Sequence, residues 1–361
     1  MFQSVFSTEI WLNTTTIVGL LYAIYLTSLS NKKLLRGSNN NLLPTILVII
    51  ATLYIGTRPI WCYADTWLYT TIFNLVQSGA WVETKSIEDE LFWNFIEYFC
   101  ISVTDASGWL LVISCFYVLG MSIAAYRWFP KHFLLAVIFM FTAFSFWGYA
   151  TNGLRQGMST SLALVGLSFF MKNKLNLIIG YSFLILAALT HTSCLLLIAV
   201  ATTALFFKNT KTNIKIWLCS IVAGLLFQSQ FKSLFAGIID DERMTNYLLN
   251  IAVTDNLFTN TGFRWDFIIY SSMPIILGWY AIIKKGQADK TYTFLLNTYI
   301  FANAFWILIN TVAYSNRFAY LSWFMYPIIL VYPLVKFQLF KRQGIVTGLI
   351  LLAAISFTFV M

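Results

Sequence analysis

Two polar side chains that border long apolar runs have the chemistry to bind an anion and to move a proton. Arg155 stands in Asn-Gly-Leu-Arg-Gln (152–156), at the start of one run, and His191 stands in Thr-His-Thr-Ser (190–193), between two others. A guanidinium forks onto phosphate oxygens and remains charged at accessible pH. An imidazole accepts or donates a proton near neutral pH. The pair suits a diphosphate clamp and a proton acceptor, although a lone histidine in a membrane protein is also common as a packing residue.

Composition identifies the elements that must position these side chains. The 361 residues are 59% hydrophobic and only 10% charged, with a mean hydropathy of +0.74, which excludes an ordinary soluble domain. About twenty apolar residues cross a bilayer as a helix, and backbone in lipid must be helical or form a closed barrel. Because the apolar runs are continuous, the barrel is excluded. The sequence therefore predicts an all-α, polytopic integral membrane protein.

We expect about twelve transmembrane helices, with both termini outside and the whole chain, 1–361, forming a single transmembrane domain. The run 175–207 can also be interpreted as one long span broken at 190–192, but two spans keep each charged turn on one side. The predicted spans are 10–30, 42–56, 107–126, 133–150, 155–171, 175–190, 193–207, 214–231, 263–283, 291–313, 318–335 and 344–361.

Charge alternates between successive turns and gives the orientation. One set of turns carries 16 of the 23 Lys and Arg residues, and the other set carries 13 of the 14 carboxylates. The basic set is Lys32, Lys33, Arg36, Arg127, Lys131, Lys172, Lys174, Lys208, Lys211, Lys215, Lys284, Lys285, Lys290, Lys336, Lys341 and Arg342. Basic turns are typical of the cytoplasmic side, so Arg155 and His191 are predicted at the same level on the outer face. The net charge of +9 is better explained by anionic membrane lipids than by nucleic acid.

Two external segments are longer than turns. The first, 57–106, is predicted to contain short helices, one starting at Thr66 with Asp65 as its N-cap and one starting at Ser86. The second helix is expected along the membrane surface or packed under the loop. The second segment, 232–262, is expected to be a solvated loop, and the alternative is a lid over an external cavity.

Arginine is favoured over lysine on the outer face, unlike on the inner one. Four arginines lie near the outer ends of spans: Arg58, Arg155, Arg264 and Arg317. Charged groups at such depth are costly unless they face a cavity or a partner, which makes them candidates for anion binding. Snorkelling, or pairing with Asp65 or Asp266, is the structural alternative. The five cysteines and the acidic residues show no metal-ligand spacing, so neither a metal nor another cofactor is expected.

The order of motifs resembles the EpsG family of Wzy-type polysaccharide and O-antigen polymerases. The resemblance rests on Leu-Arg-Gln (154–156), a basic turn, and His-Thr-Ser (191–193) in succession. It extends to Gly-Thr-Arg (56–58) followed by Asp65 and Tyr69, and to Asn-Arg-Phe (316–318) before a late aromatic-rich span.

This resemblance implies a glycosyltransferase of the bacterial inner membrane whose active site faces the periplasm or the outside. It would transfer a growing glycan from undecaprenyl diphosphate to a lipid-linked repeat unit, in O-antigen, capsule or exopolysaccharide synthesis. A chain-length regulator and a flippase are the implied partners, together with membrane lipids. Arg155, His191 and Asp65 are the candidate catalytic residues. For Asp65, helix capping is the alternative role. The candidate substrate-binding residues are Arg58, Tyr69, Asn152, Gln156, Arg264 and Arg317.

Two other functions use similar residues. A flippase or transporter of a lipid-linked or anionic solute would also have many spans and buried arginines, but its site is expected near the midplane, and the two halves show no convincing repeat. A membrane acyltransferase would also use a histidine, but its usual donor is cytoplasmic whereas His191 is predicted outside.

Overall fold

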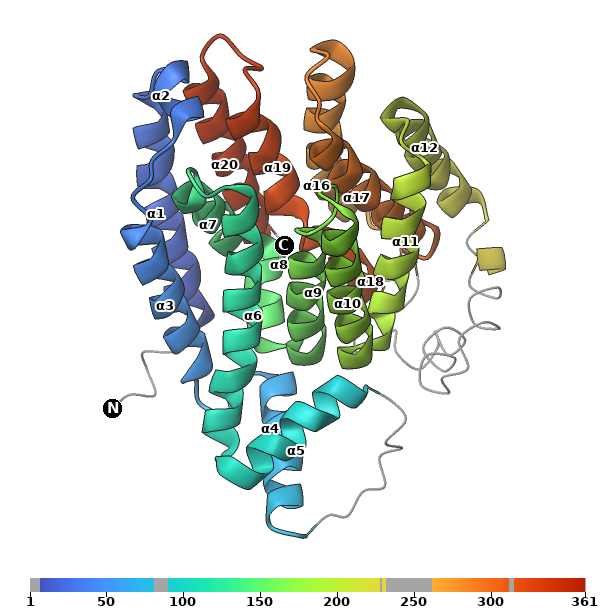
Figure 1. Cartoon of the computed structure of the whole chain (residues 1–361). Coiled ribbons are helices and arrows are strands. Elements are labelled where there is room, and N and C mark those ends of the chain that lie inside the picture. Colours follow the sequence, from blue (N-terminus) through green and yellow to red (C-terminus); the bar gives the residue numbers. More distant parts are fainter. Residues whose placement is uncertain (1–6, 81–89, 228, 232–261, 312–314, 361) are drawn as a thin grey trace. The chain divides into compact units, whose positions relative to one another are not determined.

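The computed structural model describes residues 7–80, 90–227, 229–231, 262–311 and 315–360, which form helices and no strand (Figure 1). The prediction of an all-α chain is confirmed for these residues. The chain divides into two compact units, Met1–Ile198 with Leu330–Met361, and Ala199–Ile329. The single domain over 1–361 stays a prediction.

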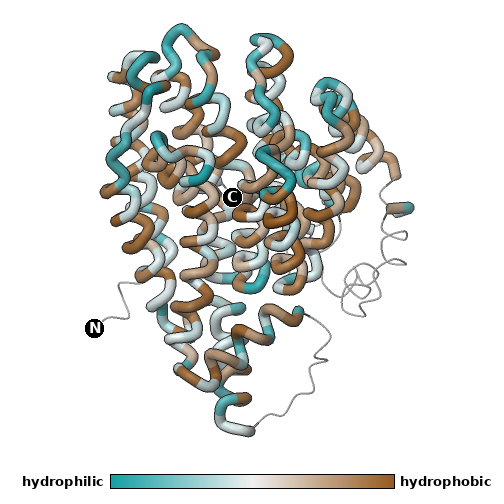
Figure 2. The backbone as a smooth tube through the Cα atoms, viewed as in Figure 1, coloured by the Kyte–Doolittle hydropathy of each residue, from teal (hydrophilic) through white to brown (hydrophobic). Residues whose placement is uncertain are grey.

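The first unit contains most of the helices. They are α1 (Thr8–Thr27), α2 (Asn31–Arg36), α3 (Leu42–Gly56), α4 (Ala64–Gln77), α5 (Leu91–Val103), α6 (Ala106–Trp128), α7 (Phe133–Phe141), α8 (Phe144–Thr151), α9 (Leu154–Leu167), α10 (Lys174–Thr190), a 3₁₀ turn η2 (Thr192–Cys194) and α20 (Gln343–Val360). Figure 2 shows hydrophobic residues along these helices and hydrophilic residues around α2 and the turn before α20.

Small residues let the central helices of the first unit pack closely. Helix α9 packs between α6 and α10, and α1 packs on α20. A Cβ built on Gly166 of α9 would lie 2.7 Å from the carbonyl oxygen of Gly180 on α10, so only glycine fits there. Close backbone approach of this kind is typical of helix pairs in membranes, where dispersion contacts replace a hydrophobic driving force.

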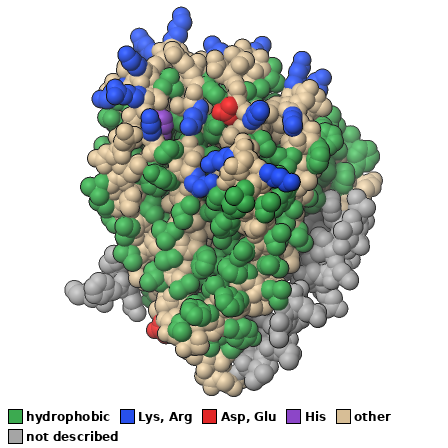
Figure 3. Space-filling model, viewed as in Figure 1, with side chains coloured by type: hydrophobic (Ala, Val, Ile, Leu, Met, Phe, Trp, Pro, Cys, Tyr) green, Lys and Arg blue, Asp and Glu red, His purple; other side chains and the backbone are tan. Residues whose placement is uncertain are grey.

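The basic turns of the first unit meet at one end. The side chain of Asn31 in α2 donates to the carbonyl of Phe340 at 2.9 Å, and Nε2 of His132, just after α6, lies 2.9 Å from the carbonyl of Leu34. These contacts join α2, the turn after α6 and the turn before α20, which carry Lys32, Lys33, Arg36, Lys131, Lys341 and Arg342. Figure 3 shows Lys and Arg side chains over this region and hydrophobic side chains along the helix flanks. We call it the basic end.

Helix α9 connects the basic end with the opposite end of the unit. Arg127, at the end of α6, donates from Nε to Ser168 Oγ at 2.8 Å, directly after α9, and its guanidinium lies 3.5 Å from the ring centre of Phe169. Arg155 lies in the first turn of the same helix. With a rise of about 1.5 Å per residue, the two ends of α9 are about 20 Å apart. The end that carries Arg155 is therefore far from the basic turns.

The second unit carries its own buried polar links. Its helices are α12 (Thr210–Leu226), α16 (Trp265–Trp279) with a π-helical end η3 (Tyr280–Lys284), α17 (Lys290–Leu308) and α18 (Asn316–Trp323), while α11 (Leu195–Phe206) and α19 (Tyr326–Lys336) cross the unit boundaries. Trp217 donates to Asn303 Oδ1 at 2.8 Å, and Asn303 donates to Ser322 Oγ at 3.0 Å. These bonds join α12, α17 and α18.

Among the described residues, four helices are long and apolar enough to cross a membrane, or five if the bent pair α7 and α8 is one span. A helix lies over each of the twelve predicted ranges, but several are shorter than a full crossing. The span predicted at 133–150 is bent by 69° between α7 and α8. Thr142 donates its hydroxyl to Ile138 O and Ala143 adopts extended backbone, which ends α7. Both residues are buried, as irregular backbone at membrane depth requires.

The segment 57–106, which is predicted to be external, contains two short helices among its described residues, with starts that differ from the predicted ones. Helix α4 begins at Ala64 with Tyr63 at its N-cap, so Asp65 is not the cap but lies in the first turn, where its charge complements the helix N-terminus. The start predicted at Ser86 lies outside the described residues, and α5 begins at Leu91. Phe95 and Phe99 of α5 are exposed and Ile96 is buried. The segment 232–262 is described only at Gly262.

Candidate functional site

Arg155 lies at the start of α9, two residues after the tightly packed Gly153. The preceding Gly153 has no room for a side chain, because a Cβ there would lie 2.7 Å from the ring of Tyr149. The helix dipole opposes a cation in the first turn of a helix, so this position needs a compensating negative charge. The side chain of Arg155 is 30% exposed and therefore accessible to a ligand.

His191 lies where α10 ends and the 3₁₀ turn η2 begins. Its backbone is extended (φ −154°, ψ 121°), which breaks the helix and directs the residue out of the helical register. Ser159, one turn after Arg155, donates to the carbonyl of Ala187 at 2.6 Å, one turn before His191. This bond between α9 and α10 fixes Arg155 and His191 at the same level, as the sequence predicts.

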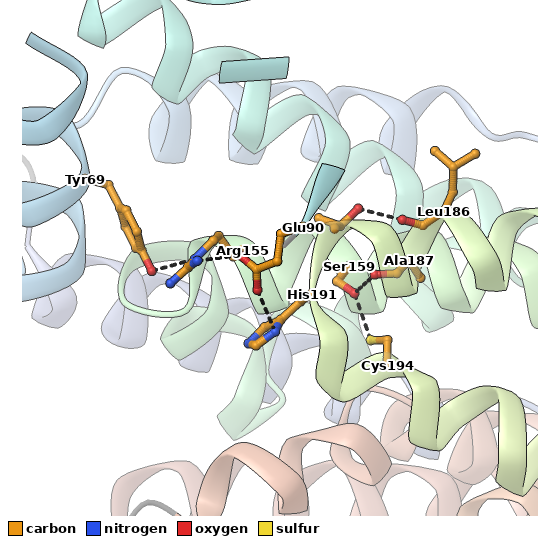
Figure 4. Close-up of polar contacts among 9 residues, drawn as sticks. Tyr69, Glu90, Arg155, Ser159, Leu186, Ala187, His191 and Cys194 are labelled. Carbon is orange, nitrogen blue, oxygen red and sulfur yellow. Dashed lines mark hydrogen bonds and ion pairs between the residues drawn. The ribbon is translucent and has the colours of Figure 1, made fainter. Parts of the chain in front are cut away.

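A single carboxylate joins the two residues. Glu90 forms an ion pair with Nη1 of Arg155 through Oε2, and its Oε1 lies 3.0 Å from Nδ1 of His191 (Figure 4). The second contact has the distance of an ion pair but not the alignment of a hydrogen bond. Glu90 is only 11% exposed in its side chain and adopts a left-handed backbone (φ 60°, ψ 48°). It provides the negative charge that Arg155 needs.

Tyr69 completes the polar cluster from α4. Its phenolic oxygen accepts a hydrogen bond of 2.8 Å from Nε of Arg155, and the guanidinium lies 5.0 Å from its ring centre. The ring lies against Trp93 of α5, with centroids 5.8 Å apart, and Trp93 lies edge-on to Trp109 of α6. This aromatic stack joins α4, α5 and α6 and positions Tyr69 and Glu90 around Arg155.

The protonation states of Glu90 and Tyr69 follow from their surroundings. Burial alone would raise the pKa of Glu90, but the neighbouring His191 and Arg155 outweigh it and lower the pKa, so the carboxylate is charged at neutral pH. Burial raises the pKa of Tyr69, which therefore retains its proton. Because its oxygen accepts from Arg155, the O–H of Tyr69 can donate to a ligand oxygen.

Three further predicted residues lie beside this cluster. Asp65 is half-buried one turn before Tyr69, and its backbone N–H donates to Asn152 Oδ1 at 3.4 Å. Gln156 follows Arg155 in α9 and is buried at 6% exposure. The structure thus brings six of the predicted site residues to one end of the first unit.

Arg58 has a different environment from the other predicted site residues. It is 2% exposed and donates to Thr66 Oγ1 at 3.0 Å and to the carbonyl of Ile55 at 2.7 Å. These bonds tie the end of α3 to α4, which favours a structural role. Direct contact with a substrate stays a prediction for Arg58.

The second unit holds the other two predicted arginines. Arg264 pairs with Asp266, with Nε 3.0 Å from Oδ1, and its guanidinium lies 3.8 Å from the ring centre of Phe267. The structural alternative of pairing with Asp266 is therefore confirmed for Arg264. Arg317 is exposed near the start of α18. Anion binding by either residue stays a prediction.

Sequence reasoning missed Glu90 as a site residue. It is the last of three consecutive acidic residues, Glu88, Asp89 and Glu90, and its spacing from the other site residues carries no motif. Its contacts depend on how α5 packs on α10, which a sequence pattern does not show. Among the described residues, no group of three or more His, Cys, Asp or Glu side chains could hold a metal ion.

An apolar groove lies elsewhere in the first unit, between α1, α3 and α7. Its volume is about 290 Å³, and Trp11, Leu47, Tyr54 and Phe141 are among its lining residues. None of the cluster residues Tyr69, Glu90, Arg155 and His191 lines it. The groove is lined mainly by apolar side chains, whereas the polar side chains of the candidate site lie in the cluster.

Comparison with known families decides the identity. The family model described as the EpsG family matches residues 41–361. The chain belongs to the EpsG family. No curated protein and no solved structure matches it. Membership of the EpsG family and the apolar helices indicate a multi-pass membrane protein of the polysaccharide-polymerase type. The matched range contains Tyr69, Glu90, Arg155 and His191.

Proposed function

We propose that this EpsG-family protein is a polysaccharide polymerase of the bacterial inner membrane. It transfers a growing glycan from undecaprenyl diphosphate to the terminal sugar hydroxyl of a lipid-linked repeat unit at the outer face. The observation that carries the proposal is the joining of Arg155 and His191 by Glu90 at the end of the first unit opposite the basic turns. An anion-binding group and a proton acceptor thereby lie within one small site.

The location of the cluster supports a reaction at the outer face. Basic turns favour the cytoplasmic side, and α9 separates Arg155 from them by about 20 Å. Nucleotide sugars and ATP are cytoplasmic substrates, whereas a sugar on a lipid diphosphate carries its own leaving group across the membrane. A site at helix ends also favours a polymerase over a transporter, whose site would lie near the midplane.

The chemistry needs positive charge at the leaving group. As the acceptor oxygen bonds to the anomeric carbon, the bond from that carbon to the diphosphate breaks and its electron pair leaves with the diphosphate oxygen. Arg155 stabilises the developing negative charge, and the O–H of Tyr69 donates to a phosphate oxygen. Asn152 and Gln156 offer amide donors beside them.

The acceptor hydroxyl must lose its proton as it attacks. His191 accepts this proton in the proposed mechanism, as an imidazole does near neutral pH. Its side chain is 24% exposed, so a sugar hydroxyl can reach it. Asp65, beside Tyr69 on α4, is the second candidate proton acceptor. A chain-length regulator and a flippase would work beside the protein, and no cofactor takes part.

The two histidines of the chain allow a matched test of this proposal. His191→Ala and His132→Ala are each expressed in cells lacking the native gene, and polymer is measured relative to the amount of protein in the membrane. His132 lies at the basic end, so its variant should make polymer at the wild-type level per protein. Cells that express His191→Ala should accumulate single repeat units, while the variant protein stays at normal abundance in the membrane. Wild-type polymer from His191→Ala would exclude the proposed role of His191, and low abundance with normal activity per protein would indicate a packing residue.

A further inference from the structure

Glu90 occupies a position that its own helix does not explain. It stands at the N-cap of α5, yet its side chain makes no capping hydrogen bond. Its left-handed backbone is unusual for a residue with a side chain and persists only where the surroundings hold it. The carboxylate faces Arg155 and His191 instead of the helix N–H groups (Figure 4).

The packing of α5 keeps Glu90 in this position. Trp93, one turn into α5, is 1% exposed and lies against Tyr69 and Trp109. Cys100, two turns later, is fully buried. Helix α5 packs on α10, which ends at Thr190, directly before His191. A carboxylate fixed by buried neighbours can orient a second side chain without losing much conformational entropy of its own.

We propose that Glu90 is a positioning residue that orients His191 for proton transfer, an inference that rests on the proposed polymerase function. A carboxylate 3.0 Å from Nδ1 favours the imidazole tautomer with its proton on Nδ1. The lone pair of Nε2 is then available to the acceptor hydroxyl.

The proton balance of the step assigns the two nitrogens separate roles. The O–H bond of the acceptor breaks, and its proton passes to Nε2 while the oxygen bonds to the anomeric carbon. The imidazole becomes an imidazolium, which the adjacent carboxylate stabilises, as in other carboxylate–histidine pairs. Glu90 itself takes no proton and touches no substrate.

A double-mutant cycle tests this inference through the coupling of Glu90 to His191. Purified variants are reconstituted in vesicles with a lipid-linked repeat unit, and polymer formation is measured per folded protein. Glu90→Gln should lower the rate by about a hundredfold, the lower end of the range for general acid–base catalysis. Glu97→Gln, the same change two turns along α5, is the matched control and should stay near the wild-type rate.

The decisive readout is whether the loss of rate caused by Glu90→Gln adds to the loss caused by a second substitution. In a His191→Ala background Glu90→Gln should lower the rate much less than in the wild type, because its larger effect passes through the imidazole and only its ion pair with Arg155 remains to be lost. In an Arg155→Lys background Glu90→Gln should still lower the rate, because His191 is present. A merely structural role would give the same loss in every background and would lower protein abundance. If the Glu90→Gln variant fails to fold, Glu90→Asp takes its place in the same cycle. This change keeps the negative charge but moves it away from His191, and the same pattern of rates is expected.

Failure of this inference is distinct from failure of the proposed function. A wild-type rate for Glu90→Gln, or an equal loss in both backgrounds, overturns the positioning role while Arg155 and His191 variants remain impaired. Wild-type rates for Arg155→Ala and His191→Ala would overturn the proposed function as well.

Discussion

Arg155 and His191, which are 36 residues apart in the sequence, contact the two oxygens of one carboxylate, Glu90. The pair is assembled by three elements: the first turn of α9, the break after α10 and the residue before α5. An ion pair between groups on different elements restricts their motion, so the geometry of the proposed site exists before a substrate arrives. Such preorganisation is the largest source of electrostatic catalysis in many enzymes.

Replacing Arg155 by lysine should impair polymer formation nearly as much as replacing it by alanine. Lysine keeps the charge but loses the planar fork, including the Nε that donates to Tyr69. If the contact strengthens as the diphosphate leaves, its loss raises the barrier by about 3 kcal/mol, roughly a hundredfold in rate.

The readout for Arg155 is the ratio of long polymer to single repeat units in cells. Arg36→Lys, an exposed arginine of α2 at the basic end, is the matched control and should behave as wild type. Robust polymer from Arg155→Lys would show that charge alone suffices at this position.

Removing the phenolic oxygen of Tyr69 should slow the reaction without unfolding the protein. Tyr69→Phe keeps the ring that lies against Trp93 but loses the hydrogen bond from Arg155. A hydrogen bond to a charged group contributes about 1.5–3 kcal/mol, so a tenfold or greater loss of rate is expected. Tyr98→Phe, on the exposed face of α5, serves as the control in the same reconstituted assay. Equal rates for the two variants would remove Tyr69 from the site.

The sequence predicts those features of the site that depend on the order of segments along the chain, and misses those that depend on how distant helices pack. The shared level of Arg155 and His191 follows from two apolar runs and one basic turn, which fix the direction of the chain. The contact of Glu90 with both residues depends on the packing of α5 against α10, so no local pattern carries it. Asp65 shows the limit at short range, because the helix starts two residues earlier than the capping preference of Asp65 indicates.

The fold shows the same division between pattern and packing. Hydrophobic runs predict where helices lie, and helices are found over each range. The bend between α7 and α8 follows from the buried turn at Thr142 and Ala143, which apolar composition does not reveal. Arg264 was a candidate for anion binding, but Asp266, two residues later, accepts its hydrogen bonds.

The orientation of the first unit is tested with reporters at its two ends. A reporter inserted after Lys174, at the start of α10, should read cytoplasmic, because basic turns remain on that side. One inserted after Gly79, which is exposed after α4, should read external. The same side for both insertions would contradict the predicted topology and the outward-facing site.

Close packing between α9 and α10 should be sensitive to a single methyl group. Gly166→Ala places a Cβ 2.7 Å from a backbone oxygen of Gly180, which the helices relieve only by separating. Overpacking costs about 1–3 kcal/mol, so the midpoint of thermal unfolding in detergent should fall. Ser182→Ala on the exposed face of α10 is the control and should leave it unchanged. An unchanged midpoint in Gly166→Ala would show that α9 and α10 are not closely packed there.

The central claim is that the cluster around Arg155 transfers glycan from a lipid diphosphate. The most direct measurement reconstitutes the purified protein in vesicles with an undecaprenyl-diphosphate-linked repeat unit and follows both the polymer ladder and released undecaprenyl diphosphate. The wild-type protein should produce both in matching amounts, and Arg155→Ala should produce neither. Transbilayer movement of the lipid-linked unit without polymer, or an unchanged ladder from Arg155→Ala, would contradict the account.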